Sequence, residues 1–277
     1  MNRCKRETKR AISVSAPPER WTISRFCVLY HRPMSRLVPG ALLFLLATAA
    51  LAQPASSLVV GPGILVREKA YLGAQPEVIP IPWIEMRAGR FSLRGLQASF
   101  DLGGQGPLRL AAIGNLRLGG VESGDLEPRM ELFERDPTVE LGLAATLPFR
   151  SFRIGAEASA DVLGQHGGWD AALRVTRMVR AGRLVLIPGA GLRYWSGELA
   201  SYEYGLEPGE AGFAAGHEVG GAAIPEASLA GSWALGPKWS LVGFARASRL
   251  GDGMLASPIV GRRTEIMGGF GLARRIW

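Results

Sequence analysis

The chain has 277 residues, 47% hydrophobic and 20% charged, with 37 glycines, 18 prolines and two cysteines. This composition excludes an intrinsically disordered, a collagen-like and a disulfide-framework protein. No apolar run reaches the roughly 18 residues of a membrane helix, which excludes a helical membrane protein. The net charge is +8, but residues 1–33 hold eight basic and two acidic residues, whereas 53–277 hold 23 and 22. Because the excess charge lies outside 53–277, we expect no nucleic-acid partner.

Residues 34–52 have the pattern of a secretory signal peptide. Arg36 gives a basic start, 42–51 form an apolar run, and an Ala-Leu-Ala box ends the segment. These are the three regions that signal peptidase substrates share. We therefore expect cleavage between Ala52 and Gln53.

The segment before the signal peptide matches no part of such a leader. We interpret 1–33 as a non-native upstream extension and expect translation to start at Met34. Cys4 and Cys27 both fall in this extension. We expect 53–277 to form a single domain without disulfides, which needs a large core or a closed scaffold.

From residue 58 onward, apolar and polar residues alternate with a period of two. The pattern is clear over 150–162, where one parity is apolar or small and the other is polar or charged. The runs 107–118, 138–147 and 183–194 repeat it. Neighbouring residues of a strand point to opposite faces, so each run predicts a strand with one apolar and one polar face. Helical spacing fits these windows less well.

Two architectures could bury such strands. A soluble β-sandwich packs apolar faces together over strands of about five or six residues. A membrane barrel turns its apolar faces to lipid and uses strands of about 9–11 residues. The runs here are long, and small residues such as Ala156 and Ala158 would fill a sandwich core poorly, while Arg153 and Glu157 stand in mid-strand on the other face. We predict an all-β protein, an antiparallel transmembrane β-barrel.

The number of strands is expected to be ten, with twelve as the alternative. The candidate strands are 58–67, 78–86, 90–101, 107–119, 137–147, 150–163, 168–180, 183–195, 223–235, 238–249 and 262–277. Eleven is odd, whereas single-chain bacterial barrels have even numbers. The weakest candidates are 78–86 and 90–101, because Pro80 and Pro82 cannot donate to a ladder and suit an edge, a bend or an inward-folded segment.

Loop lengths predict the orientation of the strands. The connections 120–136 and 196–222 are long and are interpreted as extracellular loops. Those at 148–149, 181–182 and 236–237 are short and are interpreted as periplasmic turns. We expect Tyr194 and Trp195 to belong to an interfacial aromatic girdle.

Charged residues on the polar parity are expected to line the interior. They are Arg153, Glu157, Asp161, Asp170, Arg174 and Arg193, with Arg109, Arg117, Glu140, Glu226, Arg246 and Glu265. Their mixed signs favour ion pairs across a narrow lumen over a wide pore. With a hairpin turn at His166 and Gly167, we expect Asp161 and Arg174 to lie within salt-bridge distance and the barrel to be closed or nearly so.

The sequence offers little chemistry. His166 sits in a glycine-rich turn near Ser159, Asp161 and Asp170, but nothing in the spacing makes a Ser/His/acid site, and His217 completes no metal motif. We expect no enzymatic activity, no catalytic residues, no metal and no cofactor.

Four stretches, in order, resemble the MipA/OmpV family of outer-membrane proteins. They are GPGILVREKAYLGAQPEVIPIPWIEMRAGRFSLRG (61–95), DVLGQHGGWDAAL (161–173), IPGAGLRYWSGELASYEYGLEPGEA (187–211) and ASRLGDGMLASPIVGRR (247–263). The last two are similar to family loop segments, whose residues here are Tyr202, Tyr204, Gly205, Ser257 and Pro258. This chain departs from the family here, because it has Glu203-Tyr204-Gly205-Leu206 where family members usually have an aromatic pair followed by Gly-Val.

The resemblance implies a place in the outer membrane, in contact with its lipid. It also implies a scaffold role, in which the protein brings a lytic transglycosylase and a murein synthase together. The alternative that the residues leave open is a narrow channel or small-solute permeability factor.

Overall fold

The computed structural model describes residues 56–120, 132–133 and 135–277. Ala52 and Gln53 lie outside them, so cleavage of a signal peptide at this point stays a prediction. N-terminal sequencing of the protein from membranes should begin at Gln53, and peptides containing Cys4 or Cys27 from the same preparation would contradict it.

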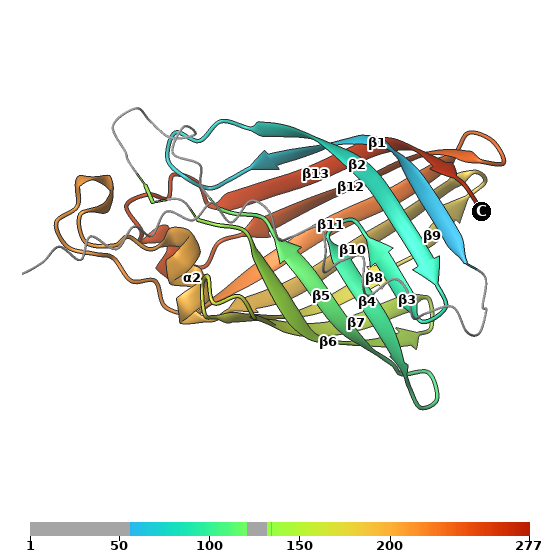
Figure 1. The fold of residues 1–277 in the computed structure, drawn as a ribbon, viewed down its shortest axis with the longest axis horizontal. Coiled ribbons are helices and arrows are strands. Elements are labelled where there is room, and N and C mark those ends of the chain that lie inside the picture. Colours follow the sequence, from blue (N-terminus) through green and yellow to red (C-terminus); the bar gives the residue numbers. More distant parts are fainter. Residues whose placement is uncertain (1–55, 121–131, 134) are drawn as a thin grey trace, which may run out of the picture. The chain divides into compact units, whose positions relative to one another are not determined.

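The described residues form a β-barrel with short helices at one end (Figure 1). The strands are β1 (Ser57–Glu68), β2 (Glu77–Ala88), β3 (Phe91–Arg94), β4 (Gln97–Gly103), β5 (Arg109–Arg117), β6 (Thr138–Phe149), β7 (Phe152–Asp161), β8 (Trp169–Arg177), β9 (Val179–Ala181), β10 (Leu184–Trp195), β11 (Ala222–Ala234), β12 (Trp239–Arg249) and β13 (Thr264–Arg275). The helices are α2 (Gly197–Tyr204), the 3₁₀ helix η1 (Glu210–Gly212) and α3 (Asp252–Leu255). No helix in this part of the chain is long and apolar enough to cross a membrane.

Antiparallel pairing closes the sheet into a ring. β13 returns to β1, and β10 pairs with β11. β8 and β9 keep one register along β10, since Gly189 pairs with Thr176 and Leu184 with Ala181. They are two parts of one strand interrupted at Met178. The barrel therefore has twelve strands over the described ranges, and the predicted antiparallel barrel is confirmed.

The preferred count of ten fails because the candidate 90–101 is two strands. β3 and β4 pair with each other through Arg94 and Gln97 and are joined by Gly95 and Leu96. Gly95 has φ of 57°. Glycine adopts this left-handed region without strain, and it is the residue that a two-residue hairpin of type II′ needs at its first position.

The two prolines of β2 lie on a strand edge, one of the three roles that the sequence allows them. β3 is short and pairs only with Glu85–Ala88 of β2, so residues 78–83 of β2 have β1 as their single partner strand. Ile84 accepts from the Gly95 N–H at 3.1 Å, so even-numbered residues of β2 turn their backbone groups away from β1. Pro80 and Pro82 have this parity, and they remove two N–H groups that no strand would satisfy.

The outward face is apolar and is rimmed by aromatic residues. Exposed outward side chains include Leu141, Leu143, Leu173, Leu192, Leu229, Phe270 and Leu272. At the short-turn end they include Phe100, Phe149, Phe152, Trp233 and Trp239, and at the long-loop end Trp169 and Tyr194, whose rings lie 5.5 Å apart. Tyr194 thus lies in a girdle as predicted. Trp195 does not, because the next residue of a strand faces the other way; its ring stacks on Tyr204.

Arginine in place of Ala156, which is exposed in the middle of β7, should lower the free energy of unfolding by about 2–4 kcal/mol, because a lipid-facing charge at mid-bilayer is poorly solvated. Urea titration of the protein in lipid vesicles measures this. The control is Val162→Arg, at an exposed position just past β7, where about 0–1 kcal/mol is expected near the interface. Equal effects at both positions would argue against this lipid-facing surface.

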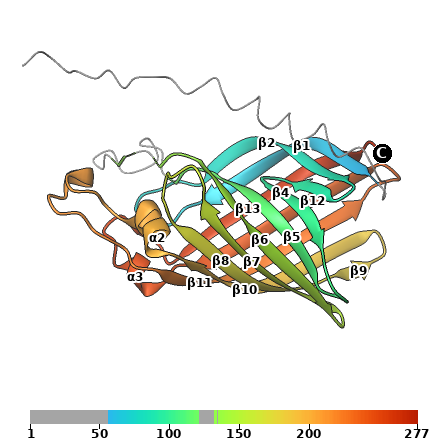
Figure 2. The same ribbon diagram turned by 60° about the horizontal axis from the view of Figure 1, so that its bottom comes forward.

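The long-loop end holds the hydrophobic core. Loop and helix side chains pack there with inward residues of the adjoining strand ends. α2 lies at this end in Figure 1, and Figure 2 shows α2 and α3 together there. The buried members are Ala70, Tyr71, Ala74, Leu132, Ala200, Tyr204, Leu206, Val219, Ala222, Ile224, Leu250, Met254 and Ile259. The loops therefore form a packed cap, called the loop cap below.

Candidate functional site

A network of ion pairs lies on the polar parity of neighbouring strands. Arg193 of β10 is its centre: its guanidinium lies 2.5 Å from Asp170, 3.1 Å from Glu226 and 3.2 Å from Glu157. The side chains of Asp170 and Glu226 are only 3% and 5% exposed. Charge-assisted bonds of this length compensate for the removal of the carboxylates from water.

Three further arginines complete the network. Arg117 bonds to Glu140 at 2.6 Å and to Asp170 at 2.9 Å. Arg174 lies 3.5 Å from Glu157 and 3.4 Å from Glu226, and Arg246 lies 4.0 Å from Glu226. Four arginines thus face four carboxylates (Glu140, Glu157, Asp170 and Glu226), which leaves the network without net charge. We call these eight residues the ion network.

The predicted pair of Asp161 and Arg174 is wrong. Arg174 lies opposite Gly155, and Ser159 lies opposite Asp170, so the hairpin is centred earlier than His166 and Gly167. Asp161 instead closes its own loop. Its carboxylate accepts from the Thr138 hydroxyl at 2.6 Å and from the backbone N–H groups of residues 163, 166 and 167.

Of the predicted interior residues, Glu157, Asp170, Arg174 and Arg193 meet in the ion network. Arg153 shares their parity but is exposed near the β6–β7 turn, and it makes no ion pair with the residues that the structure describes. We propose that these side chains point into the barrel interior. The substitutions of Arg174 and Arg193 described below test this position.

Ser159 and His166 come close to the same acids but do not form a catalytic pair. The Ser159 hydroxyl donates to Glu140 at 3.0 Å. The His166 Nδ1 accepts from the Gly168 N–H, and its Nε2 lies 3.3 Å from Glu140 outside hydrogen-bonding geometry. A nucleophile needs a base bonded to its hydroxyl, and here the serine faces a carboxylate of the network instead. Likewise, no group of three or more potential metal ligands occurs among the described residues.

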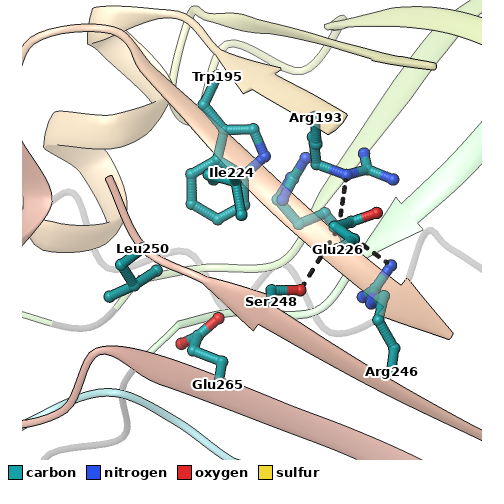
Figure 3. A pocket seen from close by; sticks show the side chains of 9 residues that line it. Arg193, Trp195, Ile224, Glu226, Arg246, Ser248, Leu250 and Glu265 are labelled. Atoms are coloured by element: carbon teal, nitrogen blue, oxygen red, sulfur yellow. Dashed lines mark hydrogen bonds and ion pairs between the residues drawn. The ribbon is translucent and has the colours of Figure 1, made fainter. Parts of the chain in front are cut away.

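A small cavity of about 90 Å³ separates the ion network from the loop cap (Figure 3). Its lining is Arg117, Arg193, Trp195, Ile224, Glu226, Arg246, Ser248, Leu250 and Glu265. In Figure 3, Glu226 lies between Arg193 and Arg246. The Trp195 Nε1 is buried and has no hydrogen-bond partner among the residues that the structure describes. A cavity this small and polar suits a few water molecules.

Three of the five family-motif residues, Tyr204, Gly205 and Ser257, belong to the loop cap. Tyr204 is buried, donates to Glu265 at 2.6 Å, and its carbonyl accepts from the Ser257 hydroxyl at 2.5 Å. Gly205 ends α2, and a Cβ there would come within 2.4 Å of the Ser201 carbonyl oxygen. Pro258 follows Ser257 at the surface. Tyr204 therefore has a packing role in the loop cap.

Tyr202 is placed differently, in the wall of an outer cavity of about 640 Å³. The lining also includes Phe133, His166, His217, Glu198 and Glu218. The Tyr202 hydroxyl donates to the Asp136 carbonyl at 3.0 Å. Burial raises the pKa of Tyr202 to about 12, so the phenol stays protonated at neutral pH.

Arg135 and Glu210 form a buried ion pair that connects segments of the loop cap. No sequence pattern predicts either residue as part of a site. The Arg135 guanidinium donates to the carbonyls of Tyr202, Gly205 and Phe133 and lies 2.8 Å from Glu210, whose side chain is fully buried. Burial by itself would raise the pKa of Glu210, but bonds from Arg135 and from two backbone N–H groups lower it overall. No spacing in the sequence links two loop residues 75 positions apart.

Glu203 of α2 is expected to make the stability of the loop cap depend on pH. It is buried, and it is reached by the Tyr71 hydroxyl at 3.5 Å. Burial raises the pKa of the Glu203 carboxyl; Arg117 opposes this and Glu265 adds to it. Below the ordinary glutamate pKa of about 4.3 the group is neutral whether docked or not, so α2 has its full stability. That stability is lost as the pH rises through the raised pKa.

Hydrogen exchange of α2, corrected for the intrinsic rate, is therefore expected to show more frequent opening as the pH rises from 4 to 8. In Glu203→Gln this pH dependence should disappear. Glu210 works in the opposite direction, since its lowered pKa gives stability that is present above its ordinary pKa and is lost only as the pH falls through the lowered value, at the acid end of this range. An identical pH profile in the variant and the parent would contradict the assignment.

Comparison with known proteins places this chain among outer-membrane proteins. A family model described as MltA-interacting protein MipA matches residues 60–276. The MltA-interacting protein of Escherichia coli K12 is 28% identical over 237 residues, covering 82% of this chain and 94% of that protein. The putative outer membrane protein YiaT of the same strain is 28% identical, covering 75% and 86%. A solved outer membrane channel from Pseudomonas putida F1 aligns with a TM-score of 0.42 and 10% identity, covering 81% and 97%.

Proposed function

The chain belongs to the MipA family of outer-membrane β-barrels, and from that premise we propose that it is a non-enzymatic scaffold for murein enzymes. In this role it holds a lytic transglycosylase and a murein synthase together at the cell wall. The name of the E. coli relative, MltA-interacting protein, supports the first partner.

The observation that supports the proposal is the close packing of polar and apolar side chains around a small cavity. Residues of the loop cap and of the ion network line the same cavity of only about 90 Å³. Such a barrel offers little room for a solute to pass, so its surfaces are the parts available for function. The short-turn end faces the periplasm if the long loops are extracellular, and murein lies on that side.

The experiment is binding of the purified barrel to the purified lytic transglycosylase of the same organism, followed by the synthase. We expect binding of each enzyme, weakened by Arg183→Glu and Lys238→Glu in the short turns. The matched control is Glu198→Lys and Glu218→Lys, exposed residues of the long loops, which should bind like the parent. Absence of binding to both enzymes would refute the scaffold.

A narrow channel is the alternative, and one observation favours it. Ala111, Ala144 and Gly155 share the parity of the ion network, are small and are only partly buried. The interior toward the short turns can therefore hold water, with the network as the constriction. In planar bilayers the scaffold proposal expects a conductance far below that of a general porin, rising when Arg174 is changed to alanine. Large, stable channels in the parent would favour the channel.

A further inference from the structure

The basic residues of this nearly neutral barrel gather at one end. Eleven exposed side chains in the short turns and adjoining strand ends are basic: Arg87, Arg90, Arg109, Arg150, Arg153, Arg177, Arg180, Arg183, Lys238, Arg274 and Arg275. Asp101 is the one exposed acid there within the described ranges, and its carboxylate accepts from the Gly103 N–H. The long-loop end, in contrast, exposes Asp136, Glu198, Glu207, Glu218 and Asp252 beside its arginines.

Four of these arginines lie over outward aromatic rings. The guanidinium of Arg90 is 5.9 Å from the centre of Phe100, Arg150 is 5.5 Å from Phe149, Arg177 is 5.6 Å from Phe152 and Arg274 is 5.6 Å from Trp239. Aromatic girdles of outer-membrane barrels lie at the depth of the lipid headgroups. The rings therefore hold the four guanidinium groups at the level of the lipid phosphates.

The four guanidinium groups have no carboxylate partner in the described part of the chain. Each keeps its N–H donors in a planar fork that matches two oxygens of a phosphate. We propose that Arg90, Arg150, Arg177 and Arg274 form a ring of binding sites for the phosphate groups of anionic phospholipids in the leaflet at the short-turn end.

Their distribution favours lipid over a protein partner. Three of the aromatic partners lie on β4, β6 and β7, within four neighbouring strands, and the fourth, Trp239, lies on β12 in the opposite part of the ring. A protein docked on one side would reach only some of them, whereas annular lipids reach all. The inference is independent of the scaffold role, because lipid binding and enzyme capture are measured separately.

The test uses the full protein in detergent, titrated with phosphatidylglycerol or phosphatidylcholine and followed by native mass spectrometry. We expect the parent to bind phosphatidylglycerol more tightly. The double variant Arg150→Gln/Arg177→Gln should lose roughly 10- to 25-fold in phosphatidylglycerol affinity, since one basic residue near an anionic surface contributes roughly fivefold. The matched control is Arg249→Gln/Arg263→Gln at the long-loop end, where a change below about twofold is expected.

Heat-modifiable mobility on gels confirms that each variant is folded, and single substitutions replace the double variant if it is not. Equal binding of the two lipids by the parent, or equal losses in the two double variants, would overturn the proposal. So would a double variant that keeps its lipid affinity but no longer captures a murein enzyme, because the arginines would then be a protein docking surface.

Discussion

Replacing Arg193 by alanine is expected to lower the free energy of unfolding of the barrel by about 3–5 kcal/mol. The side chain is 13% exposed and bonds to Asp170, Glu157 and Glu226. Its removal leaves two of these carboxylates almost completely buried with fewer donors, and an uncompensated buried charge costs far more than a lost surface pair. Urea titration of the protein in lipid vesicles measures the change.

Two variants separate the ion network from a general effect of losing charge. Arg249→Ala removes an exposed arginine at the end of β12 and should change stability by less than about 0.5 kcal/mol. Arg193→Met combined with Asp170→Asn should cost less than the sum of the two single changes, since it removes both ends of one pair. If Arg193→Ala costs no more than Arg249→Ala, the network does not stabilise the barrel.

The second large effect is expected at Arg135, whose replacement by alanine should loosen the loop cap by about 3–5 kcal/mol. Glu210 would remain buried without its cation, and the carbonyls of Tyr202 and Gly205 would lose their donor. The strands do not depend on these bonds. Hydrogen exchange should therefore rise over α2 and η1 while the strand amides keep their protection.

The matched control is Arg262→Ala. Arg262 is also a loop arginine with a carboxylate partner, Glu68, but its side chain is 43% exposed, and pairs in contact with solvent contribute little. Arg135→Lys should recover only part of the loss, because an ammonium cannot serve several carbonyls and a carboxylate in one plane. Uniform loss of protection over the strands and the loop cap would show that Arg135 supports the whole barrel instead.

Two predictions are wrong because they depend on how strands pair across the sheet, which the local sequence pattern does not specify. The alternation over 90–101 predicts one strand although Gly95 interrupts it, and only the pairing of β3 with β4 shows that this glycine belongs to a hairpin turn. The pair of Asp161 and Arg174 required a register that no local pattern specifies. The seven-residue loop 162–168 is instead closed by the Asp161 carboxylate, which shifts the partners of β8.

Trp195 shows a different kind of error, because the period of two already excluded it from the girdle. Adjacent strand residues face opposite sides, so Tyr194 and Trp195 cannot both meet lipid. The long loops resisted prediction altogether. Arg135 and Glu210 carry no period and no motif, and the roles of Arg135, Glu203 and Glu210 depend on contacts between loops distant in the sequence.

The sequence by itself determined the barrel: alternation over long runs, small residues on the apolar parity and charges on the other leave an antiparallel membrane sheet as the arrangement that satisfies both faces. It also located ten of the twelve strands, since each run ends in glycine, proline or a polar turn. Only the tertiary structure decided which charges meet and how the long-loop end is closed. Side-chain parity is a local property of one strand, whereas the partner of Arg174 or Arg193 depends on register and curvature summed around the whole ring.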